Sequence, residues 1–292
     1  MRAVSTSLAI VAAALVIGAG CGPRPTSSGV GGSSGVGGTS GAGGTSGGGT
    51  GGTSATRPPC YTAANDTVLI GDSYINWISH QLPIDLNNVS GEQWQNYAIG
   101  GFSLATGGLG LIPPQLDAAL RDHPNLKAIV MDGGGNDVLL CDALQFPGCD
   151  QCKNSPNSPN VPACQQIIQR ALDTAKAMMQ KSATSNVRDV VYFFYPHVPE
   201  GTLIGGLSPN QILDYALPKA KALCDSAIQI TNGKLRCHFV DLIPVFANHP
   251  EYFAPTDIHP NGAGSAAMAR AIWDVMQRDC VSQKSSAGCC AP

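Results

Sequence analysis

Short apolar runs alternate along the chain with longer segments in which apolar residues recur at helical spacing. Gly, Pro, Asn and Asp bound the short runs, as is typical of buried strands. Strands are therefore predicted at residues 67–70, 96–99, 127–132, 189–194 and 238–241. The longer segments predict amphipathic helices at residues 74–82, 113–122, 163–182, 209–231 and 262–278, and Pro218 predicts a kink or break in the fourth of these.

This alternation of strands and helices predicts the fold class. Right-handed crossovers between successive strands produce a parallel sheet with helices on both faces. We therefore expect an α/β protein, a three-layer α/β/α sandwich with five parallel strands. In such sheets, sites form beyond the carboxyl ends of the strands, and chemistry-bearing residues are sought there.

The N-terminal region has a different composition from the rest of the chain. Residues 1–20 carry Arg2 and then an apolar run, which is typical of a secretory signal peptide. Cys21 follows and resembles a bacterial lipidation site, although Gly18 departs from the usual pattern; ordinary cleavage and release is the alternative. Residues 21–59 are rich in Gly, Ser and Thr, which predicts a flexible linker. We therefore expect an exported protein, held at a membrane only through a lipid anchor on Cys21 or else secreted.

The remaining residues, 60–292, are long enough for one domain with its own core. Ten of the eleven cysteines lie in it, and an even number in an exported chain predicts disulfides. Four of them fall in an insertion at residues 141–164. Cys149 and Cys152 have the spacing of a redox pair or half a zinc site, but no companion ligand pair follows, so disulfides are favoured and no metal is expected.

Charge excludes one class of partner. The formal net charge is −3, and no Lys/Arg cluster is present. Nucleic-acid binding requires concentrated positive charge, so no nucleic-acid partner is expected.

A candidate nucleophile follows the first predicted strand. Ser73 lies in the string Gly71-Asp72-Ser73, between this strand and the helix predicted at 74–82. A serine at a helix start has a free backbone N–H, and the helix dipole favours negative charge there. The alternative is that Ser73 only caps the helix.

Candidate donors for an oxyanion follow the next two strands. Gly101 ends the second strand, where a substrate could approach its backbone N–H; a plain turn glycine is the alternative. Asn136 follows three glycines after the third strand and offers a side-chain amide, unless it only shapes a turn. Asp137 is expected to shape that loop rather than to do chemistry.

A candidate base precedes the last helix. His259 can take and return a proton near neutral pH, and Asp257 can orient its imidazole. The alternative for His259 is a capping or solvent-facing histidine before Pro260. His197 follows the fourth strand on the same edge of the sheet, so a substrate contact is assigned to it.

These strings resemble the blocks of the SGNH hydrolases, also called GDSL esterases and lipases, over residues 65–280. The resemblance implies a flavodoxin-like fold, Ser73 as nucleophile, His259 as base, and Ser73, Gly101 and Asn136 as oxyanion donors. One block departs from the family: the acid is expected at position 256, which is Thr256, and the aspartate stands one residue later, at Asp257. We take Asp257 as the acid; a backbone carbonyl or another acid is the alternative.

The expected function is a serine esterase that hydrolyses small or polymeric carboxylic esters through an acyl-enzyme, without a cofactor. Two alternatives stay open. One is a carbohydrate deacetylase of the same fold, for which Trp77 and Trp94 are candidate sugar-stacking residues. The other is a non-catalytic surface lipoprotein that binds a partner.

Overall fold

A parallel five-stranded sheet forms the centre of the fold in the computed structural model, which describes residues 66–78, 80–140, 152, 159–202, 209–255 and 257–282. The strand order is β4-β1-β5-β6-β7, and all neighbouring strands are parallel. The strands are β1 (Thr67–Ile70), β4 (Gln95–Asn96), β5 (Ala128–Met131), β6 (Asp189–Phe194) and β7 (Arg236–Asp241). The predicted fold class is confirmed.

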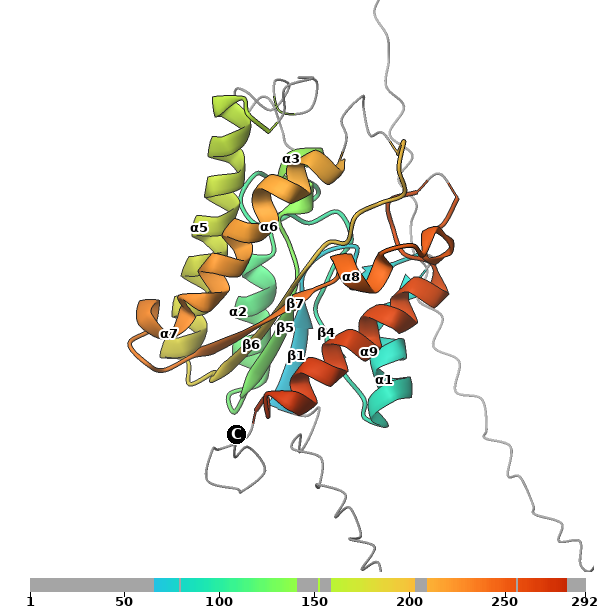
Figure 1. The fold of residues 1–292 in the computed structure, drawn as a ribbon. Helices are drawn as coiled ribbons and strands as arrows, with labels where there is room; N and C mark the ends of the chain where they lie inside the picture. The colour runs from blue at the N-terminus through green and yellow to red at the C-terminus, as the bar shows by residue number, and fades with distance from the viewer. Residues whose placement is uncertain are drawn as a thin grey trace, which may run out of the picture. The chain divides into compact units, whose positions relative to one another are not determined.

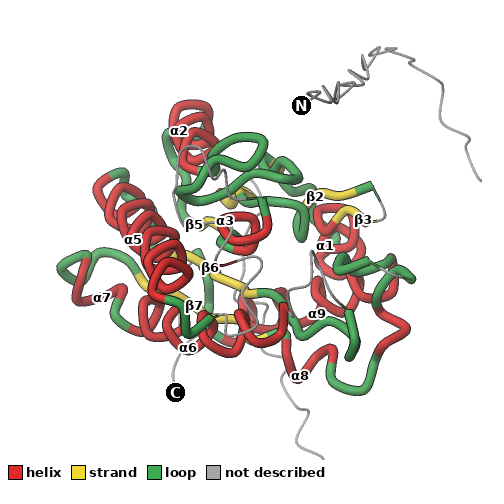
Figure 2. The backbone as a smooth tube through the Cα atoms, turned by 90° about the horizontal axis from the view of Figure 1, so that it is seen from above, coloured by secondary structure: helices red, strands yellow, loops and turns green. Residues whose placement is uncertain are grey.

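Helices cover both faces of the sheet (Figures 1 and 2). One face carries α2 (Pro113–Asp122), α5 (Pro162–Thr184) and α6 (Pro209–Asp225), and the other carries α1 (Leu82–Ser90) and α9 (Gly262–Arg278). The shorter helices are α3 (Gly135–Leu139), α7 (Ala227–Ile230), α8 (Ile243–Phe246) and the 3-10 turn η2 (Pro250–Tyr252).

Burial on both faces explains why the central strands are continuous apolar runs. Side chains of β5 alternate between two cores: Ile129 packs in the core under α2, α5 and α6, whereas Val130 packs in the core under α1 and α9. Every residue of β1, β5 and β6 is buried.

The helix predicted at residues 74–82 is wrong. After a turn, Asn76–Trp77 (β2) pairs antiparallel with His80–Gln81 (β3), and α1 begins only at Leu82. Pro83 accounts for the later start, because proline is favoured in the first turn of a helix. The apolar residues before Pro83 are buried without forming a helix: Tyr74 and Ile75 are buried in the turn.

Other boundaries also differ from the prediction. α6 continues through Pro218, and the segment predicted at 209–231 divides instead at Ser226, between α6 and α7. The second strand is shorter than predicted: only Gln95–Asn96 pair as β4, although Tyr97 and Ile99 still donate backbone hydrogen bonds to Leu69 and Gly71. The fifth strand begins at Arg236, two residues before the predicted start.

Disulfides are present in the domain. Cys152 is bonded to Cys164 at the start of α5, and Cys224 of α6 is bonded to Cys237 of β7. Cys280 is disulfide-bonded as well. The predictions for the signal peptide, Cys21, the linker and most of the insertion at 141–164 lie outside the described residues. Within the described part of the chain, no helix is long and apolar enough to cross a membrane.

Candidate active site

The candidate residues gather at the carboxyl ends of β1 and β5. β1 lies between β4 and β5, so the chain leaves the sheet in opposite directions from neighbouring strands at this point. Such a switch in strand order leaves a crevice at the carboxyl edge of a parallel sheet. Ser73 follows β1, and Asn136 lies in α3 directly after β5.

Ser73 lies in a turn rather than at the start of a helix. The backbone N–H groups of Ile75 and Asn76 both donate to the carbonyl oxygen of Asp72, at 3.2 Å. The expected contribution of a helix dipole at Ser73 is therefore wrong, because α1 begins nine residues later, at Leu82. The side chain of Ser73 is held in a buried position by the turn itself.

Gly71 is clamped from two sides. The Gln115 side chain accepts from the N–H of Gly71 at 2.7 Å and donates to its carbonyl oxygen at 2.9 Å. A Cβ at residue 71, where φ is +149°, would lie 1.6 Å from Oδ1 of Asp132. The same Oδ1 accepts from the N–H of Asp72 at 2.7 Å. Only glycine fits here, and the clamp sets the path of the chain into Ser73.

Ser73, His259 and Asp257 form a continuous hydrogen-bonded chain. Nε2 of His259 lies 2.9 Å from Oγ of Ser73, and Nδ1 lies 2.7 Å from Oδ1 of Asp257. An ionised carboxylate only accepts, so Nδ1 carries the proton and Nε2 is left as the acceptor that faces the serine hydroxyl. This arrangement suits removal of a proton from Ser73.

Asp257 is held by its own loop despite its shifted spacing. Its Oδ1 atom accepts from the backbone N–H groups of Ile258 at 2.7 Å and His259 at 3.2 Å. Burial alone would raise the pKa of Asp257, but the hydrogen bonds from the His259 side chain and from these backbone groups lower it below the ordinary value. Asp257 is therefore ionised at neutral pH. Thr256 lies outside the described residues.

Two aromatic side chains position His259. The Trp77 ring stacks on the imidazole with centroids 4.2 Å apart and an interplanar angle of 17°. The Tyr74 hydroxyl donates to the carbonyl oxygen of Ile258 at 2.5 Å and ties the histidine loop to the serine turn. Trp94 is buried against Trp273 in the core under α1 and α9, so it is unavailable for the expected sugar stacking.

Two of the three predicted oxyanion donors are backbone N–H groups, those of Ser73 and Gly101. Gly101 has φ +82°, the left-handed region that favours glycine, and a Cβ there would meet Leu109 at 2.7 Å. Within the described ranges, neither Ser73 nor Gly101 has a protein acceptor for its backbone N–H. The Asn136 side chain is already engaged: Nδ2 donates to the carbonyl oxygen of Phe102 at 2.9 Å and to Oδ2 of Asp72 at 3.3 Å.

Buried acids lie behind the serine turn. Oδ2 of Asp72 accepts from the Tyr195 hydroxyl at 2.6 Å, and the same hydroxyl accepts from the N–H of Gly135 at 3.0 Å. Burial raises the pKa of Asp72, an effect that the hydrogen bond from Tyr195 partly offsets. Burial, and then the charge of Asp72, raise the pKa of Asp132 well above its usual range, which favours its neutral form.

Asp137 shapes the neighbouring loop, as expected. Its carboxylate accepts from the backbone N–H groups of Leu104, Ala105 and Thr106 at 2.7 to 3.0 Å. Burial raises the pKa of Asp137 to about 6, although these hydrogen bonds favour the charged form. The loop leads directly from Gly101, so Asp137 supports one of the backbone donors.

His197 is not among these residues. Its Nε2 atom pairs with Asp214 of α6 at 2.7 Å, and it lines a separate surface pocket beside α8. A substrate contact at Ser73 therefore has no support in the geometry. Within the described part of the chain, no group of three or more His, Cys, Asp or Glu side chains is placed to hold a metal ion.

Five contributors were not assigned to the site from the sequence: Gln115, Asp132, Tyr195 and, in their contacts with His259 and its loop, Trp77 and Tyr74. A usable signal existed for two of them. Asp132 is the last residue of one predicted strand and Tyr195 directly follows another, at the edge where the site was expected. Gln115 lies in the first turn of α2, and nothing in its local pattern distinguishes it from a solvent-facing glutamine.

The sequence model of the GDSL-like lipase/acylhydrolase family matches residues 52–267. None of the curated proteins matches the chain. Similar solved structures include a carbohydrate acetylesterase family member from Sinorhizobium meliloti (14% identity, TM-score 0.48, covering 72% of this chain and 96% of that chain). An acetylxylan esterase from Geobacillus stearothermophilus is also similar (15% identity, TM-score 0.45, 75% and 96%). A third is a protein from Lactobacillus plantarum (17% identity, TM-score 0.47, 74% and 98%). None of the three bears on the substrate.

Proposed function

Because the chain belongs to the GDSL-like lipase/acylhydrolase family, we propose that it is a serine esterase acting through Ser73, His259 and Asp257. The observation that carries this proposal is the hydrogen-bonded chain of 2.9 Å from Ser73 to His259 and 2.7 Å from His259 to Asp257. Each link has the donor and acceptor that nucleophilic attack requires.

In the proposed reaction, Oγ of Ser73 attacks the ester carbonyl carbon while Nε2 of His259 takes the hydroxyl proton. The tetrahedral intermediate collapses when His259 returns this proton to the leaving alkoxide, and an acyl-serine and an alcohol result. Water then attacks the acyl-serine with His259 again as base, releasing the carboxylic acid. Asp257 stabilises the imidazolium formed in both halves. The reaction needs no metal or organic cofactor.

The oxyanion is assigned to the backbone N–H groups of Ser73 and Gly101 and to the Asn136 amide. The two backbone donors have no competing acceptor in the described part of the chain. Asn136 must exchange its long contact to Asp72, 3.3 Å, for the substrate oxygen, while it keeps the 2.9 Å bond to Phe102. The longer hydrogen bond is the weaker one, so this exchange costs little.

Ser73→Ala tests this function. Hydrolysis of p-nitrophenyl butyrate should fall by several orders of magnitude, because the nucleophile is lost while the fold is kept. Ser185→Ala, at the far end of α5, is the matched control and should keep the parental rate. A fluorophosphonate probe should label the parent and the control but not Ser73→Ala. Parental turnover by Ser73→Ala would rule out the assignment, and no labelling of the parent would favour a binding protein.

We also propose that the enzyme is exported and tethered to a membrane through a lipid on Cys21. The apolar run within residues 1–20, the cysteine that follows and the Gly/Ser/Thr-rich residues 21–59 support this proposal. In a bacterial host, the full chain should partition with membranes, and Cys21→Ser should release it in soluble form. Equal membrane association of both forms would contradict the anchor.

A further inference from the structure

An apolar cavity begins at Ser73 and extends beneath α3 and between α5 and α6. Its volume is about 90 Å³, several times what one water molecule requires. Asp72, Ser73 and Asn136 line it at the catalytic end, and Ile168, Ala171 and Ala216 line it between the helices. The three helices that enclose it gather over the same side of the sheet (Figure 1).

We propose that this cavity is the subsite for the acyl chain and that it makes the enzyme selective for aliphatic acyl groups longer than acetyl. The inference rests on the proposed function, since it places the acyl carbonyl carbon at Oγ of Ser73. In this arrangement, α5 and α6 recognise the acyl chain of the substrate.

The chemistry of the walls favours a hydrocarbon. Leu213 and the three wall residues between the helices are apolar and almost fully buried. The polar groups further in are already committed: the Asn210 amide pairs with both backbone groups of Val198, and the Tyr192 hydroxyl donates to the carbonyl oxygen of Gly133. A sugar ring or charged head group would lose its hydrogen bonds to water without replacement, and a methylene chain has none to lose.

The position of His259 determines which half of the ester, acyl or alcohol, enters the cavity. His259 must return its proton to the alkoxide, so the alcohol has to lie on the His259 side, beside the half-buried Trp77 ring. The acyl chain then points the other way, past Asn136 and Tyr195, into the cavity. The alcohol faces the surface, and the acyl chain faces the core.

The dependence of kcat/KM on the length of the acyl chain tests the subsite directly. Each methylene buried in an apolar site should raise kcat/KM about four-fold, until the cavity is full. The parent should therefore hydrolyse p-nitrophenyl hexanoate at least ten times more efficiently than the acetate. Equal efficiency, or a preference for acetate, would overturn the proposal.

Filling the cavity should remove this preference. Ala171→Leu and Ala216→Leu each place three further carbons in the space, and each should lower the hexanoate-to-acetate ratio about ten-fold. Ala177→Leu and Ala222→Leu make the same change at exposed positions of the same two helices and should keep the parental ratio. Unchanged ratios in both cavity variants would show that the chain does not enter.

Acetate turnover also reports the fold of each variant. Should a leucine prove too large, Ala216→Val makes a smaller change, for which a three-fold fall in the ratio is expected. Fluorophosphonate labelling separates the esterase proposal from the subsite proposal: if the probe does not label Ser73, the esterase proposal is wrong. If Ser73 is labelled and acetate is hydrolysed without any chain-length dependence, only the subsite is wrong.

Discussion

The loop around Asp257 compensates for the position of the acid, which lies one residue later than in the family. Its carboxylate accepts two backbone N–H groups of its own loop as well as the imidazole of His259, an arrangement that aspartate adopts readily in turns. The same loop is closed at its base, where the N–H of Asn261 donates to the carbonyl oxygen of Tyr252 at 2.8 Å. The carboxylate therefore reaches Nδ1 although the family places the acid one position earlier.

Asp257→Asn should lower kcat by up to about 10⁴-fold, because an amide no longer stabilises the imidazolium and no longer selects the required tautomer. Ester hydrolysis measured at pH 7 checks this expectation. The control is Asp214→Asn, which alters a second Asp–His pair with the same 2.7 Å separation but at the exposed His197. Near-parental turnover by Asp257→Asn would show that another group orients His259.

The lowered pKa of Asp257 also sets a pH window. A carboxyl whose pKa is lower in the folded protein than in the unfolded chain stabilises the fold at high pH and loses this contribution as the pH falls through its folded value. Because the ordinary value is about 4, the difference in unfolding free energy between the parent and Asp257→Asn should shrink as the pH falls below 4. Denaturant titrations from pH 5 down to pH 2 measure it, and a difference that does not shrink over this range would contradict the assignment.

At the scale of elements, short turns rather than helices carry the reacting groups. Ser73 lies in a turn before β2, and the loop that starts at Gly101 is held by Asp137 of α3. Periodicity cannot predict such segments, because their hydrogen bonds run to side chains distant in sequence. The helix wrongly predicted at 74–82 illustrates this: its apolar residues are buried, but by the turn and by the pairing of β2 with β3.

Asp137→Ala tests the role of this loop. Three backbone N–H groups, of which those of Leu104 and Thr106 are buried, would lose their acceptor, so the free energy of unfolding should fall by about 3 kcal/mol. Because the loop then displaces Gly101, kcat should fall as well, by up to about a hundredfold. Asp173→Ala, on the exposed face of α5, should change neither quantity. Unchanged stability in Asp137→Ala would show that water replaces the carboxylate.

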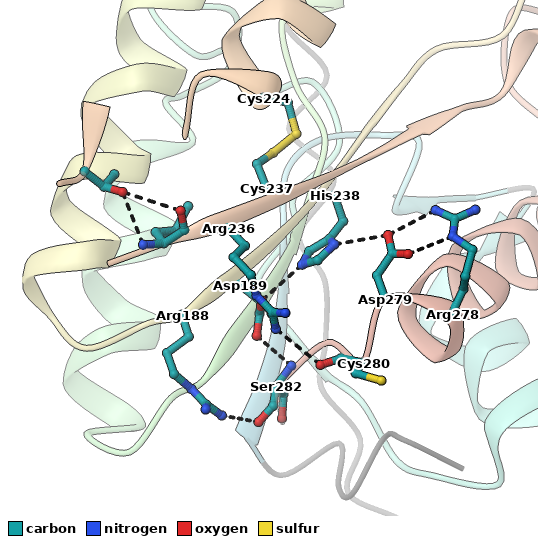
Figure 3. A network of polar contacts seen from close by, with 12 residues as sticks. Arg188, Asp189, Cys224, Arg236, Cys237, His238, Arg278, Asp279, Cys280 and Ser282 are labelled. Carbon is teal, nitrogen blue, oxygen red and sulfur yellow. Dashed lines mark hydrogen bonds and ion pairs between the residues drawn. A yellow bond between two sulfur atoms is a disulfide. The ribbon is translucent and has the colours of Figure 1, made fainter. Parts of the chain in front are cut away.

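At the scale of the whole molecule, the proposed active site and a stabilising network occupy opposite edges of the sheet. The residues of the proposed site lie at the carboxyl ends of the strands, whereas Asp189 begins β6 at the other edge. Its fully buried carboxylate accepts from the Arg236 side chain and from the N–H of Ser282, and its Oδ1 atom lies 3.0 Å from Nε2 of His238 (Figure 3). This network joins the segment after α9 to the starts of β6 and β7.

Asp189→Ala should therefore lower the free energy of unfolding by about 3 kcal/mol, since it removes the carboxylate to which Arg236 and the buried N–H of Ser282 donate. The kcat of the folded protein should be unchanged, because no residue of the network contacts the site. Thermal unfolding and ester hydrolysis on the same preparations separate the two effects. Asp274→Ala, exposed on α9, is the control. A loss of kcat in Asp189→Ala would show that the two edges are coupled.

The sequence by itself determined the five-stranded α/β fold, the bounds of the helices at 113–122 and 262–278, and the segments that supply the residues of the proposed site. It could do so because burial on both faces of a sheet, and amphipathic helices over it, leave patterns within a few neighbouring residues. The Cys152–Cys164 and Cys224–Cys237 disulfides show the limit of such patterns, since a count of cysteines predicts that they pair but not which partners meet.

Only the tertiary structure decided which of these residues meet. It showed that Asp257 reaches His259, that His197 turns away to Asp214, and that Gln115, Asp132 and Tyr195 hold the serine turn. It also showed the cavity between α5 and α6. The physical reason is distance along the chain: Ser73 and His259 are 186 residues apart, and contacts of that kind depend on how the layers pack, which no local pattern records.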